Sequence, residues 1–478
     1  MSGFPAARNF PEAARTALQD TQMRRNVRHA TDVIRRKRDR VVEERGDWQA
    51  LRDSGSALRQ HVLEHLDEYL LQFEQACTAA GGQVHWVRDA AGANLIVLDI
   101  LARHSIREVI KIKSMTTEEI GLNAALRARG IDAVETDLAE LIVQLGHDAP
   151  SHIVVPALHR NRQQIREIFL REMQLSELGD TAEDLTTAAR SWLRRKFLEA
   201  RAAISGANFL IAETGSVVIV ESEGNGRMCL TLPRLLISIA GIEKVIPRFQ
   251  DLEVFLQTLP RSATGERMNP YNSIWTGSAV QDGGQEFHVI LLDNGRSRIL
   301  ADREARQTLK CIRCGACQNV CPVYRQTGGH AYGSVYGGPI GAVLTPQLHQ
   351  LEQGASLPYA SSLCGACYEV CPVKIDIPEV LIHLRGQVVE KEQHTLAGAL
   401  GAWNLGMQAA ARVFSSGARL QVAQAAARAA QRPFVQRSGY IERLPFLLSG
   451  WTQTRDLAAI PEESFRAWWA RREKESRP

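Results

Sequence analysis

Three things are scarce in this 478-residue sequence: long apolar runs, aromatic residues and an excess of charge of one sign. The N-terminus has no apolar run after a basic start, so we expect no secretory signal. The longest uncharged stretch near the C-terminus, residues 395–411, is shorter than the roughly 20 apolar residues that a membrane-spanning helix needs. The net charge of +4 is too small to indicate the concentrated basic field of a nucleic-acid-binding domain. Aromatic residues make up 6%, but with 45% hydrophobic residues the chain is neither largely disordered nor collagenous.

Common catalytic motifs are also absent. The sequence contains no GxSxG, no Walker-type loop and no GxGxxG, so acyl transfer and common nucleotide binding receive no support. At about 100–200 residues per domain, the length predicts about three domains.

The most informative feature of the composition is the number of cysteines. There are nine, an odd count, and seven of them lie between positions 311 and 371. This distribution excludes a ladder of disulfides. We therefore expect a cytoplasmic protein whose reduced thiols serve as metal ligands.

The first cysteine motif is Cys311-x2-Cys314-x2-Cys317-x3-Cys321-Pro322. This spacing is typical of bacterial ferredoxins, in which three cysteines hold one [4Fe–4S] cluster and the fourth ligates the other cluster. A zinc site is the alternative. Zinc sites usually need only two cysteine pairs, however, so zinc does not account for the full motif.

A second copy follows 50 positions later. CGACQNVCPV, from Cys314, and CGACYEVCPV, from Cys364, are identical at eight of ten positions. Crosswise ligation assigns one cluster to Cys311, Cys314, Cys317 and Cys371, and the second cluster to Cys321, Cys364 and Cys367. Ser361 stands where Cys311 stands in the first copy, so the fourth ligand of the second cluster is open: Ser361, a displaced residue, solvent, or a [3Fe–4S] state. Cys77 and Cys229 lie outside the motifs and are interpreted as structural.

Upstream of the motifs, strand and helix patterns alternate, which is typical of an α/β domain with a mostly parallel sheet. We expect helices over 90–104, 118–129 and 161–173, and downstream over 340–353 and 379–392 as part of a helical ferredoxin module. The expected strands are residues 83–88, 108–112, 133–137, 152–155, 208–212, 216–221, 235–240 and 287–292.

Three loops of this domain are candidates for ligand binding. Thr116 and Glu119 fit a capping box, where free amides near Lys113 could also receive an anion. The turn from Glu223 to Arg227 contains Asn-Gly and fits a hairpin. The loop 156–162 lies near His152 and carries His159. If the domain binds a small acid, the candidate anion-binding residues are Arg227, Lys113 and His159.

The two ends of the chain are basic. The pattern of residues 1–55 predicts charged helices, which would form either a solvated face or a docking arm. From residue 401 onward there are 12 Arg and Lys against 6 Asp and Glu, and the region 395–478 holds four of the eight tryptophans. We expect this helical region to pack against the ferredoxin domain or a partner subunit, with contact to an acidic lipid surface as the alternative.

The motifs together resemble the lactate-utilisation protein B family. The resemblance lies in CIRCGACQNVCPVYRQTGGHAYGSVYGGPIGAVLTP and LPYASSLCGACYEVCPVKIDIPE, and upstream in KSMTTEEIGLN, SHIVVPALHRNR and AETGSVVIVESEGNGR. It implies a LUD domain of the sugar-isomerase/CoA-transferase-like α/β type, an α-helical ferredoxin-type domain with two clusters, and a small helical C-terminal region. With the N-terminal helices, the expected division is 1–55, 56–300, 301–394 and 395–478. The seven motif cysteines carry over as cluster ligands.

The resemblance also implies a function. The chain would be the iron–sulfur electron-transfer subunit of a three-protein complex that oxidises L-lactate to pyruvate, with no catalysis of its own. Its partners would be the other two subunits, and its location cytoplasmic or peripheral at the inner face of the membrane. The alternatives are a self-contained iron–sulfur oxidoreductase that binds a small hydroxy acid in the α/β domain, or the iron–sulfur subunit of another dehydrogenase.

Overall fold

The computed structural model describes residues 9–277, 284–349, 351–395, 401–453 and 455–475. The chain divides into two compact units, residues 1–388 and 389–478, and each is described by itself. The expectations for the first eight residues, and for residues 396–400 of the uncharged stretch, lie outside the described residues.

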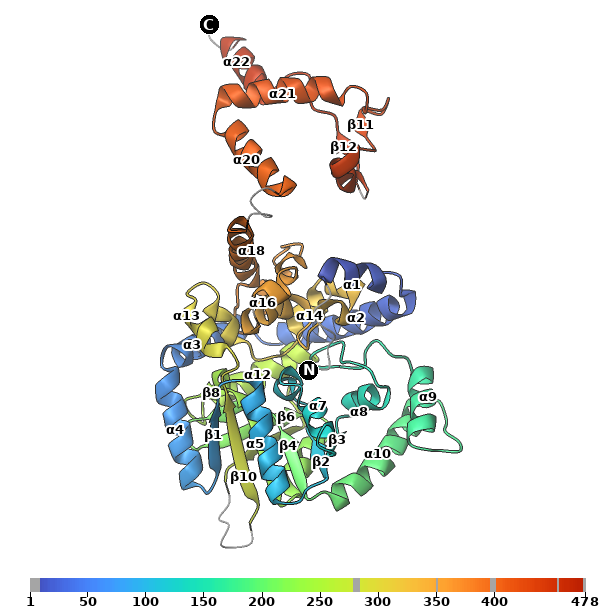
Figure 1. Ribbon diagram of the computed structural model, residues 1–478, viewed down its shortest axis with the longest axis vertical. Coiled ribbons are helices and arrows are strands. Elements are labelled where there is room, and N and C mark those ends of the chain that lie inside the picture. Colours follow the sequence, from blue (N-terminus) through green and yellow to red (C-terminus); the bar gives the residue numbers. More distant parts are fainter. Residues whose placement is uncertain (1–8, 278–283, 350, 396–400, 454, 476–478) are drawn as a thin grey trace. The chain divides into compact units, whose positions relative to one another are not determined.

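The centre of the first unit is a six-stranded sheet with the strand order β1-β10-β7-β4-β2-β3, in which every neighbouring pair is parallel (Figure 1). A wholly parallel sheet requires crossover connections and covered faces, which agrees with the α/β prediction. The strands are β1 (Gln83–Val87), β2 (Glu108–Lys111), β3 (Asp132–Glu135), β4 (Ala202–Ser205), β7 (Leu235–Gly241) and β10 (Glu286–Leu292).

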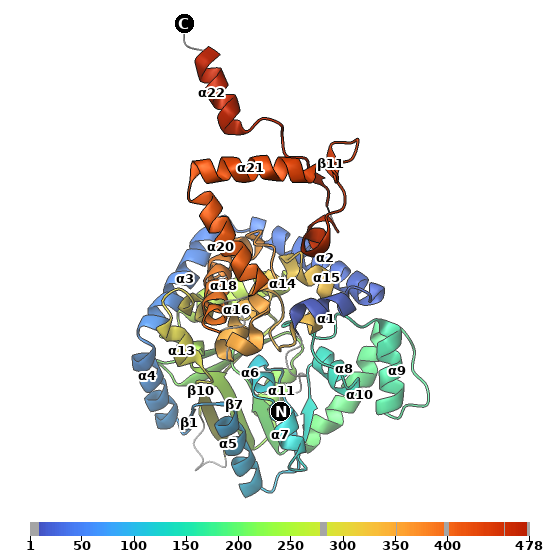
Figure 2. The same cartoon turned by 45° about the horizontal axis from the view of Figure 1, so that its top comes forward.

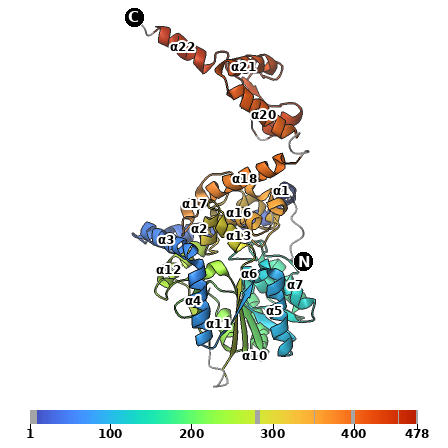
Figure 3. The ribbon, with the colours of Figure 1, turned by 60° about the vertical axis from the view of Figure 1, so that its left-hand side comes forward.

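Alternating side chains of these strands build two cores, one on each face of the sheet. In β7, Ile237 and Ile239 join the core beneath α5 (Ala90–Arg103) and α7 (Leu122–Arg127). Leu236 and Ala240 point to the other face. That face is covered by a second sheet and by helices that include α4, so α4 and α5 lie on opposite sides of β10 (Figure 3). The helices of this second layer are α4 (Leu66–Ala79), α8 (Leu138–Leu145), α9 (Arg162–Glu172), α10 (Ala182–Glu199) and α11 (Asn225–Thr231).

The second sheet has four strands in the order β8-β5-β6-β9. β5 pairs antiparallel with β6 and parallel with β8, and β6 pairs antiparallel with β9. The strands are β5 (Phe209–Ile211), β6 (Ser216–Glu221), β8 (Val245–Ile246) and β9 (Tyr271–Trp275), and α12 (Leu252–Ala263) follows β8.

Two expected elements of this domain are wrong. Residues 152–155 form bends, not a strand, because the Nδ1 atom of His152 accepts the N–H groups of Val154 and Val155 that a strand would need. The helix expected over 118–129 is two short helices, α6 (Met115–Glu119) and α7, because Gly121 between them has a φ of +64°. In contrast, β4, a central strand, was not predicted.

The helical ferredoxin region follows the sheet. Its motif helices α14 (Ala316–Val320) and α17 (Ala366–Val370) lie side by side, with α16 (Gly338–Leu348) against α14. The expected helices 340–353 and 379–392 correspond to α16, which is shorter, and α18 (Ile377–Gln393). The remaining helices of this region are α13 (Arg296–Ala301), α15 (Tyr324–Thr327) and the 3-10 turns Arg306–Lys310, His330–Tyr332, Leu351–Gly354 and Leu357–Tyr359.

The charged N-terminal helices pack on this region, as a docking arm would. They are α1 (Phe10–Ala17), α2 (Thr21–Glu43) and α3 (Trp48–Glu64). Figure 2 shows α2 beside α15, where Arg24 donates to Gln326 and Arg325 pairs with Asp32 at 2.6 Å. The Phe10 ring contacts the Tyr332 ring, with centroids 5.0 Å apart.

The second unit is mostly helical. It contains α20 (Ala402–Phe414), α21 (Gly417–Gln431), α22 (Phe465–Glu475) and a two-stranded ribbon of β11 (Tyr440–Ile441) and β12 (Leu457–Ala458). α21 and α22 have no buried residues, and Trp451, Trp468 and Trp469 are exposed. Within the described part of the chain, no helix combines the length and apolar character needed to cross a membrane.

Candidate iron–sulfur centres and the pocket beside them

Both cysteine motifs adopt the same local structure. In the first, Arg313 and Gly315 have φ angles of +60° and +72°, and α14 begins directly after them. In the second, Leu363 and Gly365 have φ angles of +55° and +83°, and α17 follows. Each motif is a tight left-handed turn followed by one helical turn. This geometry brings cysteines that are separated by two intervening residues to the same side of the chain.

Four motif cysteines line one cavity between the two copies: Cys311, Cys314, Cys317 and Cys371. Its other lining side chains include Ile340, Ile375 and Ile377, so the cavity walls are apolar. Cys311, Cys314 and Cys371 are buried, and Cys317 is half-buried. Cys371 comes from the second motif, so the folded chain places it with three cysteines that precede it by more than 50 residues.

The other three motif cysteines form a second group. Cys321 and Cys367 are buried, whereas Cys364 is exposed. Burial is the main cause that raises the pKa of Cys367 to about 12, and Cys321 and Cys364 add to the increase by charge repulsion. Cys364 likewise contributes to the raised pKa of Cys321. The three thiols are therefore electrostatic neighbours.

The two cysteine groups suit iron–sulfur clusters. Burial raises the pKa of Cys371 to about 11 and that of Cys314 further, so these thiols carry no charge without a bound cation. Thiolate is the ligand type that iron–sulfur clusters require, and iron supplies the missing positive charge. Backbone N–H groups of Arg313 and Ile375 donate to the sulfurs of Cys311 and Cys371 at 3.4 Å, which is the kind of contact that tunes a cluster.

Ser361 lies in the turn of the second motif. Its hydroxyl accepts the N–H of Leu363 at 3.1 Å, and its carbonyl accepts a hydrogen bond from Arg385. The hydroxyl thus takes part in the turn that precedes Cys364.

Arginines of the N-terminal helices hold the motif backbone. Arg52 donates to the carbonyls of Cys371 at 2.9 Å and Tyr368 at 3.0 Å. Arg59, 1% exposed, donates to the carbonyls of Leu309 and Lys310 just before the first motif. Sequence reasoning missed both residues because a basic helix indicates a solvated face until its partner carbonyls are known.

A buried charge network joins the α/β domain to the first motif. Arg296 forms two bonds of 2.9 Å with Glu119 and one of 2.5 Å with Glu243. Glu243 also binds Arg313 at 3.1 Å, and the Tyr336 hydroxyl donates to Glu119 at 2.6 Å. Burial would raise the pKa of Glu243, but Arg296 and Arg313 outweigh it and lower this pKa to about 2.

This network corrects the expected capping box. The N-cap of α6 is Ser114, not Thr116: the Ser114 hydroxyl accepts the N–H of Thr117. The Glu119 carboxylate pairs with Arg296 instead of closing a capping box. Lys113 donates to the carbonyl of Val154 at 2.7 Å.

The Glu223–Arg227 turn is also not a hairpin. Gly224, with φ +80°, is the N-cap of α11, which follows β6 directly. The Glu221 carboxylate accepts the N–H groups of Glu223 and Gly224 at 2.7 Å and so turns the chain into the helix. Arg227 stacks over the Tyr271 ring.

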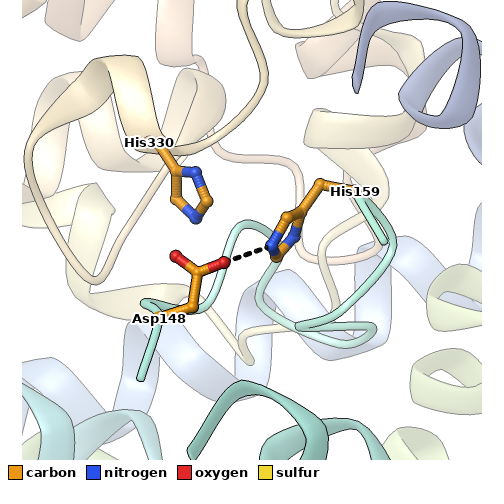
Figure 4. A group of neighbouring side chains, drawn as sticks. All are labelled: Asp148, His159 and His330. Carbon is orange, nitrogen blue, oxygen red and sulfur yellow. Dashed lines mark hydrogen bonds and ion pairs between the residues drawn. The ribbon is translucent and has the colours of Figure 1, made fainter. Parts of the chain in front are cut away.

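His159 belongs to a network of hydrogen bonds between two loops (Figure 4). Its ring lies 2.8 Å from the Asp148 carboxylate and 2.7 Å from the Ser151 hydroxyl. His330, from the ferredoxin region, stacks edge-on against it and binds the carbonyl of Ala149. Asp148, His159 and His330 could together surround a cation, but Arg160 already pairs with Asp148 at 2.5 Å. His159 therefore joins loops here and lies outside the pocket described next.

A pocket of about 370 Å³ opens at the carboxyl ends of β2, β3 and β4. This edge of an open parallel sheet is where α/β proteins usually bind ligands. The pocket is lined by Lys113 and Thr116 from one of the candidate loops, but Arg227 does not line it. It also contains Lys244, Arg313 and Tyr336, so it reaches from the sheet to the first cysteine motif.

Cys77 and Cys229 lie in the core of the α/β domain. Both are fully buried, Cys77 on α4 and Cys229 on α11. Burial raises their pKa to about 11 and about 12, so both thiols stay neutral.

Two family models match the chain. A LUD domain model matches residues 70–292, and a 4Fe-4S dicluster domain model matches residues 307–375. The first covers the parallel sheet and its helices, and the second covers both cysteine motifs.

Curated relatives match over almost the full length. Lactate utilization protein B of Oceanobacillus iheyensis is 42% identical, with 98% of this chain and 97% of the relative covered. Lactate utilization protein B of Bacillus subtilis strain 168 is 43% identical at the same coverage. A protein of Escherichia coli K12 named uncharacterized electron transport protein YkgF is 40% identical, with 98% of each chain covered.

Proposed function

Since the chain belongs to the lactate utilization protein B family, we propose that it is the iron–sulfur electron-transfer subunit of a complex that oxidises L-lactate to pyruvate. One observation carries this proposal: the two cysteine motifs cross, so that one group of cysteines is enclosed and the other reaches the surface.

The proposed ligands are the seven motif cysteines. Cys311, Cys314, Cys317 and Cys371 would hold one [4Fe–4S] cluster, and Cys321, Cys364 and Cys367 the other. The fourth ligand of the second cluster is proposed to be solvent or Ser361, with a [3Fe–4S] state as the alternative. The Ser361 hydroxyl accepts the N–H of Leu363 just as the Cys311 sulfur accepts the N–H of Arg313, so it could keep this bond and still serve as the ligand.

The two clusters, when bound, accept and release single electrons. Oxidation of lactate to pyruvate releases two electrons and two protons, so two one-electron centres suit it. The chain's own residues position these centres: the arginine contacts to the carbonyls of Leu309 and Cys371 hold both motif turns against the N-terminal helices. The apolar wall of the first cavity keeps water away from the enclosed group, while the exposed Cys364 marks the side where electrons cross to a partner.

Partner contact is proposed for the second unit. Its exposed tryptophans on α22 and in the segment around Trp451 lie among arginines, such as Arg472 over Trp468 and Arg455 over Trp451. Exposed aromatic and arginine side chains are enriched at protein interfaces. The proposed partners are the other two subunits of the complex, and peripheral contact with an acidic membrane is the alternative.

The central experiment is iron and sulfide analysis of the anaerobically purified protein, combined with electron paramagnetic resonance. About eight irons per chain are expected for two full cubes, and about seven if one cluster is [3Fe–4S]. Cys371→Ser and Cys364→Ser should each alter the signal of one cluster only, and the matched variant Cys229→Ser should alter neither. A chain that binds no iron after careful reconstitution would refute the proposal.

Function in the cell is tested by deletion. A strain that lacks the gene and any paralogue should fail to grow on L-lactate, and unimpaired growth would contradict the lactate role. Purified protein alone should not reduce a dye with L-lactate. If it did, the chain would be a self-contained oxidoreductase.

A further inference from the structure

The pocket at the edge of the sheet contains a buried lysine side chain without a hydrogen-bond partner among the described residues. Lys244 ends the 3-10 turn Ile242–Lys244 between β7 and β8, and its side chain is 6% exposed. Among the described residues, its amino group makes no hydrogen bond and no ion pair, although it lines the pocket. A polar group that is buried without a partner is costly, so its place beside the pocket points to a partner that enters from there.

The other buried lysines of the same unit are paired, which makes Lys244 distinctive. Lys111 bonds to Glu135 at 2.5 Å and to Asn123 at 2.8 Å. Lys310 donates to the Ser56 hydroxyl at 3.3 Å.

The two ends of this pocket carry different sets of charged side chains. Lys244 interacts electrostatically with Arg313, Glu243 and Cys311, so this part of the pocket adjoins the first cysteine motif. Glu223 interacts with Asp137 and Lys113 instead, so the acidic part lies at the ends of β2 and β3. Apolar side chains, among them Ile153, Val155, Ile219 and Leu259, complete the lining.

We propose that this pocket binds a small organic carboxylate, whose carboxylate group pairs with Lys244 beside Arg313. The apolar lining would hold the carbon body, and the acidic part would accept a hydrogen bond from a hydroxyl group. The acidic part and the apolar lining both disfavour a polyanion such as phosphate. Nothing in this binding depends on electron transfer.

The size of the pocket sets an expectation for the ligand. At about 30 Å³ of liquid volume per water molecule, the pocket has room for roughly a dozen non-hydrogen atoms. A three-carbon acid would leave part of it filled with water, so a 2-hydroxy acid with a larger apolar body should bind more tightly than L-lactate.

The test is calorimetric titration of the anaerobically purified holoprotein with L-lactate, pyruvate, mandelate and inorganic phosphate. Saturable binding of the carboxylates, strongest for mandelate, is expected, with no binding of phosphate. Lys244→Met should weaken carboxylate binding at least tenfold. Lys310→Met is the matched control, because Lys310 is similarly buried and close to the cysteines but does not line the pocket.

A second readout separates binding from a structural role. Without ligand, Lys244→Met should raise the thermal unfolding midpoint, because it removes a buried polar group that has no partner. A structural lysine would lower the midpoint. Three results would each overturn the proposal. Lys244→Met could bind carboxylates as tightly as the wild type does, its unfolding midpoint could be lowered, or the pocket could bind phosphate in place of carboxylates. Iron content measured on the same samples shows whether the clusters are intact, so failure of carboxylate binding is distinguishable from failure of the electron-transfer role.

Discussion

Glu243 of the α/β domain binds Arg313 at 3.1 Å, and Arg313 is the residue directly before Cys314. Both side chains are buried, with 0% and 8% exposure. The Glu243 carboxylate also binds Arg296. One carboxylate of the sheet domain thus fixes the turn of the first cysteine motif, which makes the two domains a single mechanical unit at this point.

The first prediction concerns this carboxylate. Glu243→Gln leaves Arg296 and Arg313 with too little negative charge in a buried site, and breaking such a pair costs about 3–5 kcal/mol. We expect a large drop in the thermal unfolding midpoint of the holoprotein. Glu266→Gln, which removes an exposed pair with Lys37, should change stability by about 0–1 kcal/mol. Equal shifts in the two variants would contradict the role given to Glu243.

The second prediction concerns Arg52, which binds two carbonyls of the second motif. Arg52→Met removes its contacts to Cys371 and Tyr368 while keeping an unbranched side chain. The turn should then open more often, so iron should pass to an added chelator several-fold faster. Arg45→Met, which loses only a surface pair with Asp47, is the control. An unchanged rate of iron release in Arg52→Met would show that the turn holds without it.

The third prediction concerns pH. Burial raises the pKa of Glu140 to about 8, and its Oε1 atom has no hydrogen-bond partner among the described residues. The folded state therefore keeps a proton that the unfolded state releases near pH 4.5, so this group makes the protein less stable as pH rises from about 4.5 to about 8.

Glu140→Gln removes this dependence. The variant should unfold at a higher temperature than the wild type at pH 8.5, and the difference should shrink towards pH 5. Unfolding midpoints at several pH values measure it, with Glu266→Gln as the exposed control. A difference that does not change with pH would mean that Glu140 titrates normally.

The fourth prediction concerns two glycines. A Cβ atom on Gly329 would lie 1.9 Å from the carbonyl oxygen of Ser151, so Gly329→Ala should push apart the two loops that carry His330 and His159. Gly386 lies inside α18, and a Cβ atom added there would have open space around it, so Gly386→Ala should stabilise the protein by about 0.5–1 kcal/mol. Opposite signs in thermal unfolding are expected, and a tolerated Gly329→Ala would refute the close approach.

Much of the α/β fold could be predicted from periodicity. The runs at Gln83–Val87, Leu235–Gly241 and Glu286–Leu292 are apolar and bounded by turn residues, and each forms a strand of the parallel sheet. β4 was missed because its four residues, Ala202–Ser205, are too few and three of them too small to stand out as a strand until neighbours pair on both sides. The strand expected at 152–155 failed because one histidine ring takes its N–H groups.

The sequence by itself determined the family, the iron–sulfur character and the α/β and helical organisation, because these depend on local spacing: cysteines two residues apart, a repeat after 50 positions and regular apolar periods. Only the tertiary structure decided which side chains from distant segments meet. It brought Glu243 to Arg313, and it placed Lys244 in a pocket without a partner. Such meetings depend on how helices and sheet pack, and no short stretch of sequence contains that information.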